Sequence, residues 1–136
     1  IFKIVDLDEA WAFLNVAQGE TLSNKLVRAG RAMNAGVYFV TQSSGDVSKE
    51  SLKNNIGLKF SFRSTDTNEI KQTLEFFGLD SEDENNQKRL RDLENGQCLM
   101  QDLYGRVGVV QIHPVFVELL HAFDTRPPIK SEVDLE

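Results

Sequence analysis

Acidic residues follow the first apolar segment of the sequence, in positions that suit phosphate chemistry. The chain begins IFKIVDLDEAW, where an apolar run leads into Asp6, Asp8 and Glu9. A carboxylate at a strand end can hold Mg²⁺ through water, and a neighbouring glutamate can position or deprotonate a water molecule. We therefore take Asp8 as a candidate Mg²⁺ ligand and Glu9 as a candidate general base. Asp6 shares a strand face with Asp8 and is a further candidate for the metal.

Acids at the start of a helix have a second explanation that involves no catalysis. An acidic residue there can cap the helix, which stabilises it by about 0.5–2 kcal/mol whatever the function. The stretch IFKIVDLDEAW taken alone leaves capping and catalysis equally open.

A second apolar segment ends in polar residues that would share a sheet edge with the acids. Residues 37–40 form a continuous apolar run, typical of a parallel strand covered on both faces, and Thr41 and Gln42 follow it. A glutamine in that position can orient an attacking water in phosphate-cleaving sites. It can equally be a polar residue that ends a strand, and Gln42 alone favours this plainer interpretation.

Two arginines lie in the segment NKLVRAGRAMNAG between these strands. Arg28 and Arg31 are three residues apart, on the side of a predicted helix away from its apolar stripe. Such arginines are most often solvated charge. Their functional interpretation is that one of them reaches the nucleotide of a neighbouring subunit.

The composition bounds the class of protein that must position these residues. A chain of 136 residues with 40% hydrophobic residues has the size and make-up of one globular domain. Its net charge of −6 argues against a general nucleic-acid surface. The one cysteine, Cys98, cannot form an internal disulfide, which fits a reducing compartment. No apolar run approaches the roughly 20 residues that a membrane-spanning helix requires.

Hydrophobic periodicity predicts alternating strands and helices, which is the pattern of an α/β layered fold. The predicted strands cover residues 2–5, 37–40, 58–63, 97–103 and 106–112, and the last two flank a turn at Tyr104–Gly105. The predicted helices cover residues 9–17, 21–33, 49–55, 68–77 and a segment that begins at Pro114. Asp8 is expected to cap the first helix, and Asn34 and Gly36 to stop the second.

The same patterns predict which faces are buried. The second helix should bury a stripe of Leu22, Leu26, Ala29 and Met33. In the strand LKFSFR, the three apolar residues Leu58, Phe60 and Phe62 should face the core, with Lys59 on the wet face. The last helix should bury its aromatic and leucine residues, which are Phe116, Leu119, Leu120 and Phe123. Residues 80–86 are the most loop-like segment.

Five segments, taken in order, resemble the C-terminal half of conjugative-transfer ATPases. The segments are DEAW, RAGRAMNAG, VTQSS, LKNNIGLKFSFR and NGQCLMQDLYGRVGVVQIHP. These ATPases are the type IV secretion motors of the HerA/FtsK class of P-loop NTPases. The resemblance covers residues 1–123 and implies a partial RecA-like core of parallel strands with flanking helices, which ends in an antiparallel hairpin and a C-terminal helix.

The resemblance also implies roles for individual residues. Asp8 corresponds to the Walker B acid that holds Mg²⁺ through water, Glu9 to the catalytic glutamate and Gln42 to the sensor glutamine. Arg28 and Arg31 lie in the arginine motif. The expected nucleotide-binding residues are Asp8, Thr41, Arg63 and Arg106.

One departure from the family pattern limits what this chain can do by itself. The phosphate loop GxxxxGK[ST] is absent from the sequence, and its backbone N–H groups and lysine make most of the phosphate contacts. We therefore expect the chain to be a piece of a longer ATPase that begins at Walker B. The parent would use ATP and Mg²⁺, and the isolated chain would be inactive.

The resemblance implies partners and a location for the parent protein. It would form a homo-oligomeric ring, expected to be a hexamer, and would work with other secretion-channel subunits at the cytoplasmic face of the inner membrane. It would contact DNA only indirectly. Residues 124–136, with Pro127, Pro128 and several acids, are expected to form a poorly ordered tail.

Two other classes of protein are alternatives to this interpretation. A receiver-like signalling domain also has an acidic, Mg²⁺-binding strand end, but it needs an aspartate at the end of its central strand and a lysine at the end of a later one. Here the strand at 37–40 ends in Gln42, and the later strands offer Arg63 and Asp102. The third class is a non-catalytic interaction domain, in which the acids only cap helices.

Overall fold

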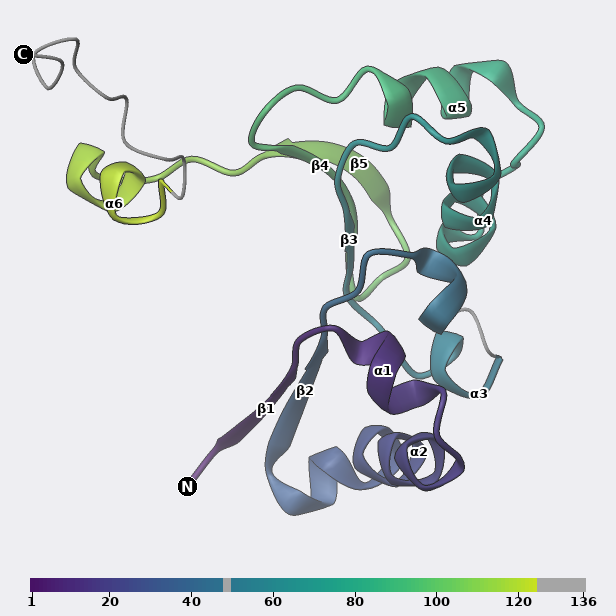
Figure 1. Ribbon diagram of the computed structural model, residues 1–136, viewed down its shortest axis with the longest axis vertical. Coiled ribbons are helices and arrows are strands. Elements are labelled where there is room, and N and C mark those ends of the chain that lie inside the picture. Colours follow the sequence, from purple (N-terminus) through teal and green to yellow (C-terminus); the bar gives the residue numbers. More distant parts are fainter. Residues whose placement is uncertain (48–49, 125–136) are drawn as a thin grey trace, which may run out of the picture.

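The computed structural model describes residues 1–47 and 50–124, which form two small sheets with helices packed on one side (Figure 1). The parallel pair is β1 (Lys3–Leu7) and β2 (Ala35–Phe39). The antiparallel sheet has the order β3 (Lys59–Ser61), β4 (Gln97–Gln101) and β5 (Val107–Gln111). The predicted α/β class, the parallel pairing of the first two strands and the hairpin at Tyr104–Gly105 are confirmed. The predicted tail lies outside the described residues, except for Asp124.

Helical segments follow β1, β2, β3 and β5 along the chain. They are α1 (Ala10–Leu14), α2 (Ala17–Met33), the 3₁₀ turn η1 (Ser44–Val47), α3 (Glu50–Lys53), α4 (Thr67–Phe77), α5 (Glu84–Arg91) and α6 (Val117–Ala122). In the part of the chain that the structure describes, no helix combines the length and apolar character needed to cross a bilayer. In Figure 1, α1 to α5 gather on one side of the strands and α6 stands apart.

One hydrophobic core joins the two sheets through the helices. Its buried residues come from α1, η1, α3, α4, α5 and β4, and they include Leu14, Leu52, Leu74 and Leu90. Leu7 of β1 and Phe39 of β2 pack against the same core. The end of the parallel pair is therefore anchored to the helices that also support β4.

The first helical segment departs from the prediction of one helix over 9–17 and a second over 21–33. The chain instead turns at Asn15 and Val16, and α2 already begins at Ala17. Gly19 makes this corner tight, because a Cβ atom placed there would lie 1.9 Å from the carbonyl oxygen of Phe13. The end of α2 agrees with the prediction, since Asn34 adopts the left-handed conformation (φ 53°) that commonly ends a helix.

Replacing Gly19 with alanine is expected to destabilise the domain. Alanine is favoured over glycine inside a helix by about 1 kcal/mol. The clash with the Phe13 carbonyl should outweigh this gain, because overpacking against backbone costs about 1–3 kcal/mol. Denaturant unfolding measures the difference. Gly108→Ala is the matched control, because a Cβ atom at Gly108 meets nothing within 4 Å. Equal stability of the two variants would contradict the tight corner.

The buried face of α2 is not the predicted leucine stripe. Gly19, Ser23 and Gly30 are buried. Of the predicted stripe, Leu26 and Ala29 are half-buried, whereas Leu22 and Met33 remain 48% and 50% exposed. Small residues let α2 approach closely, and a Cβ atom on Gly30 would lie 2.8 Å from the Ala35 carbonyl oxygen. The prediction was wrong because close backbone packing, rather than side-chain size, selects the face that this helix buries.

The strand β3 also turns the opposite face inward from the one predicted. Lys59 is 9% exposed, whereas Phe60 is 49% exposed. The Lys59 ammonium donates to the carbonyl oxygen of Phe76 at 2.8 Å and lies 4.6 Å from the centre of the Phe76 ring. Burial, together with the nearby charge of Lys53, lowers the pKa of Lys59. The lysine is accommodated because its stem packs in the core while its head finds a carbonyl at the end of α4.

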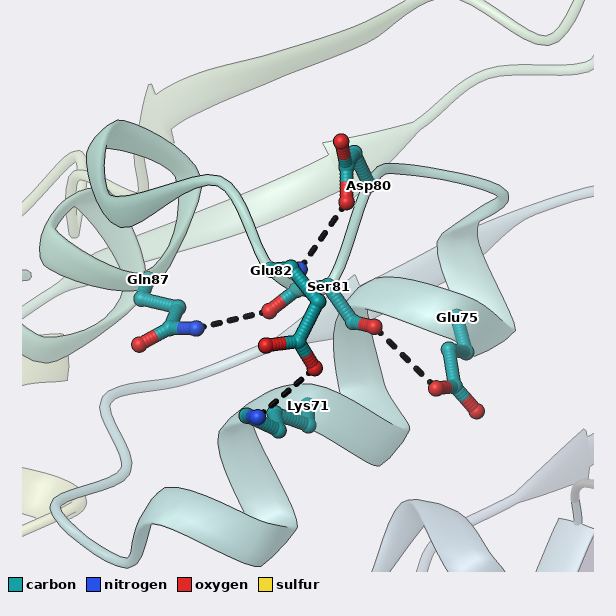
Figure 2. A network of polar contacts seen from close by, with 6 residues as sticks. All are labelled: Lys71, Glu75, Asp80, Ser81, Glu82 and Gln87. Atoms are coloured by element: carbon teal, nitrogen blue, oxygen red, sulfur yellow. Dashed lines mark hydrogen bonds and ion pairs between the residues drawn. The ribbon is translucent and has the colours of Figure 1, made fainter.

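The segment predicted as a loop over residues 80–86 is more ordered than expected. Asp83 caps α5 by accepting from the Asn85 N–H at 2.8 Å, so the last three residues of the segment are helical. Figure 2 shows the contacts that hold the turn before it, which link Lys71 to Glu82 at 2.6 Å and Ser81 to Glu75 at 3.1 Å. These contacts of acidic residues therefore order residues 80–86, which the composition had indicated as a loop.

The prediction that the last helix packs inward is wrong for the described residues. Helix α6 begins at Val117, with Phe116 as its N-cap, and not at Pro114. Every residue of α6 is exposed, and Phe116 and Phe123 are 65% and 73% exposed. The spacing correctly indicated an apolar helix face, but it could not indicate that this chain leaves that face uncovered.

Candidate functional site

The carboxyl ends of β1 and β2 bring the candidate catalytic residues to one sheet edge. Leu7 pairs with Phe39 in parallel register, so Asp8–Glu9 and Thr41–Gln42 leave the sheet at the same edge. Two backbone bonds fix this edge: the Val40 N–H donates to the Leu7 carbonyl at 3.0 Å, and the Ala10 N–H donates to the Val40 carbonyl at 2.9 Å. The structure therefore places Glu9 and Gln42 as the sequence predicted, and their chemical roles stay predictions.

Glu9 adopts an unusual backbone conformation at this edge. Its φ and ψ angles are 51° and 47°, in the left-handed region, and its side chain is exposed. This conformation costs a residue with a Cβ atom roughly 1–2 kcal/mol. Strain of this kind gathers at functional sites, where the surrounding structure enforces it. Glycine would adopt this conformation without the strain that a Cβ atom brings.

Helix capping does not account for the two acids. Asp8 was expected to cap the first helix, but Glu9 occupies the N-cap position. The Asp8 Oδ1 atom accepts the N–H of Glu9 itself at 2.9 Å, one residue before the helix. Within the described residues, the Glu9 side chain makes no capping bond either. Helix capping is therefore a weaker explanation of Asp8 and Glu9 than it was from the sequence alone.

The donor set at the edge fits Mg²⁺ held partly by a nucleotide. Asp6, Asp8 and Glu9 are all exposed and offer the hard oxygen ligands that Mg²⁺ prefers. Residues 1–47 and 50–124 contain no group of three or more acidic, histidine or cysteine side chains that could hold a metal alone. Mg²⁺ at phosphates needs only one or two carboxylates, so Asp8, with Asp6 two residues before it, suffices.

The segment after β2 is held by a polar network. The Thr41 hydroxyl donates to Asp46 Oδ2 at 2.5 Å, so in this structure it anchors the turn into η1. Ser43 and Ser44 bond to Glu69 in the first turn of α4. Gln42 lies between these anchored neighbours with an exposed side chain. Glu69 was not predicted from the sequence. The run Ser43–Asp46 indicates a turn, but no local pattern indicates a partner 25 residues away.

The candidate arginines lie in three separate parts of the chain. Arg28 is exposed on α2, and the Arg31 backbone lies in α2 while its side chain is not among those described. Arg63 is exposed just after β3. Arg106 at the hairpin is engaged by Asp102, with an Nε to Oδ2 distance of 2.7 Å, and it lies 5.4 Å from the Tyr104 ring centre.

The ion pair at the hairpin affects the pKa of its acid, Asp102. Partial burial acts to raise the pKa of Asp102, but hydrogen bonds from Arg106 and Tyr104 and the Arg106 charge together hold that pKa below its usual value. Asp102 therefore stays ionised and keeps Arg106 in the turn in this structure. Arg106 would have to leave Asp102 before it could contact a nucleotide.

Comparison with known proteins gives two matches. Residues 1–123 match the family model described as AAA-like domain. Over 119 residues the sequence is 34% identical to an uncharacterized protein, YddE, of Bacillus subtilis strain 168, and the match covers 88% of this chain. It covers 14% of that relative, so the chain spans only a small part of the relative's length.

Proposed function

This chain belongs to the AAA-like domain family, and from that premise we propose that it forms the C-terminal part of an ATP-hydrolysing motor. The family suggests an ATPase-type function and implies use of a nucleotide and Mg²⁺ in the parent. The proposed parent is a conjugative-transfer ATPase of the type IV secretion class, with a RecA-like core. This finer assignment is supported by the order of the motifs DEAW, TQ and GRVG. The family match argues against a receiver-like domain.

The observation that carries the proposal is the shared edge of β1 and β2. A strained, exposed glutamate and an exposed glutamine follow adjacent parallel strands, and backbone bonds join the two strand ends. Ligands of open α/β sheets bind beyond the carboxyl ends of the strands, where both residues lie.

Each candidate residue would have its own role in ATP hydrolysis. Glu9 would accept the proton of the attacking water, and Gln42 would orient that water. Asp8 would hold Mg²⁺ through water, and the metal would neutralise charge on the phosphates. Thr41, Arg63 and Arg106 are proposed nucleotide contacts. Arg31, or Arg28 in its place, would reach the nucleotide of the next subunit in a ring that we propose is a hexamer.

The cellular setting belongs to the same proposal. A motor of this class would work at the cytoplasmic face of the inner membrane with other secretion-channel subunits, and it would contact DNA only indirectly. The acidic balance of the chain, with a net charge of −6, supports an indirect role toward DNA.

Phosphate release by the full-length protein tests the proposal. We expect ATP turnover that stops when EDTA removes Mg²⁺. The isolated 136-residue chain should show neither turnover nor tight ATP binding by calorimetry, because it lacks the phosphate loop that supplies most phosphate contacts. A folded, assembled full-length protein that hydrolyses no nucleoside triphosphate would contradict the proposed function.

A further inference from the structure

The Glu69 carboxylate gathers three hydrogen bonds from the segment that follows β2. Its Oε2 atom accepts from the Ser43 hydroxyl at 2.8 Å. Its Oε1 atom accepts from the Ser44 N–H at 2.7 Å and from the Ser44 hydroxyl at 2.9 Å. These bonds connect α4, which leads toward the antiparallel sheet, to the residues directly after Gln42.

The helix that carries Glu69 is a rigid support. Ile70 and Leu74 are buried in the core, which fixes α4. Asp66 caps the helix by accepting the N–H of Glu69 at 2.8 Å. Thr73, one turn further along, donates to the Ser44 hydroxyl oxygen at 3.1 Å. Asp66 therefore fixes the backbone of Glu69, and the Glu69 side chain fixes Ser43 and Ser44.

We propose that Glu69 is a positioning residue that fixes the water-orienting side chain of Gln42; this inference rests on the proposed function. Gln42 itself is exposed, so packing does not determine where its side chain points. Its neighbours are fixed instead, Thr41 through Asp46 and Ser43 through Glu69. Fixing both neighbours limits the movement of the Gln42 backbone. This matters for the rate, because a displacement of about 1 Å in such a site can lower it roughly 100-fold.

A carboxylate suits this task better than an amide does. Ionised glutamate only accepts hydrogen bonds, and its two oxygens can meet all three donors. Glutamine has one accepting oxygen and an NH₂ group that only donates, so the Ser43 hydroxyl would have to turn and accept. The bonds from Ser44 would lose the strength that a charged acceptor gives them. A Glu69→Gln variant therefore keeps the size of the side chain and disturbs the hydrogen bonding of residues 43 and 44.

The test compares Glu69→Gln with Glu75→Gln in the full-length protein. Glu75 lies on the same helix, is exposed and accepts a serine hydroxyl, that of Ser81, at 3.1 Å, as Figure 2 shows. We expect Glu69→Gln to lower kcat about 10- to 100-fold with KM for ATP nearly unchanged. The Glu75 variant should stay within about twofold of the unchanged protein.

A double variant separates positioning from a general structural role. In a Gln42→Ala background, Glu69→Gln should cause no further loss of kcat, because the side chain that it positions is gone. An equal further loss in that background would overturn the proposal. Equal kcat values for Glu69→Gln and Glu75→Gln would overturn it too, while turnover of the unchanged protein would leave the proposed function standing. If the unchanged protein has no turnover, the result contradicts both the proposed function and the role of Glu69.

A milder variant covers a failure of Glu69→Gln to fold. Ser43→Ala removes one donor to Glu69 and leaves the two bonds from Ser44 in place. It should lower kcat by a smaller factor in the same direction, again without effect in the Gln42→Ala background. A folded Ser43→Ala protein with unchanged kcat would overturn the proposal.

Discussion

Replacing Glu9 with glutamine in the full-length protein is expected to remove most ATP turnover while leaving ATP binding nearly intact. The amide keeps the size and polarity of the side chain but cannot accept the proton of the attacking water. Loss of a general base typically costs about 10²–10⁴-fold in rate. Steady-state phosphate release gives kcat, and calorimetry with ATP and Mg²⁺ gives the dissociation constant.

Glu84→Gln is a suitable control for this change. Glu84 is an exposed glutamate at the start of α5, so the substitution alters charge at a helix start without touching the sheet edge. Turnover of the Glu9→Gln protein at the rate of the control would mean that Glu9 only marks the beginning of α1. The same variant in cells should abolish transfer of the mobile element if the proposed parent is a conjugative motor.

The second large effect is expected from Arg31→Ala. An arginine supplied across a subunit interface contributes about 10³–10⁵-fold in rate in related phosphoryl transfer. The variant should therefore lose most turnover, and circular dichroism checks that it keeps its fold. Lys25→Ala is the control, since Lys25 is an exposed cation on the same helix. Arg28→Ala tests the alternative arginine in the same assay.

Mixing experiments show whether the arginine acts in trans. An Arg31→Ala subunit keeps its own Glu9, and a Glu9→Gln subunit keeps its own Arg31. Mixing Arg31→Ala protein with excess Glu9→Gln protein should restore part of the turnover, because each subunit supplies what its neighbour lacks. Full assembly without any rescue would argue that Arg31 acts within its own subunit or not at all.

The parts of the fold that the sequence predicted well are those set by local pattern. The apolar runs before Asp8 and before Thr41 are short and end in polar residues, which marks both strands and their carboxyl ends. Parallel pairing then brings Glu9 and Gln42 to one edge without further information. Tyr104–Gly105 likewise predicts its hairpin, because Gly105 meets the positive φ of 78° that the turn requires.

The predicted faces failed where burial depends on distant partners. Alternation in β3 correctly separates Phe60 from Lys59, but it does not tell which side the helices cover. The carbonyl of Phe76 that receives Lys59 comes from a helix 17 residues further along the chain. In α2 the decisive feature is the close approach permitted at Gly19 and Gly30, which a hydrophobic stripe does not reveal. Glu69 was missed for the same reason.

The separation of the two sheets bears on how the domain folds. The strands β4 and β5 are joined by residues 102–106, and hairpins of this kind form in about 1–10 μs. The strands β1 and β2 are joined by the longer crossover of residues 8–34, which contains α1 and α2, so their pairing costs more loop-closure entropy than the hairpin does. We therefore expect the β4–β5 hairpin to form early. The edge that carries Glu9 and Gln42 should assemble later, as should the pairing of β3 with β4, which residues 62–96 separate. This edge would then gain protection after the hairpin and open before it.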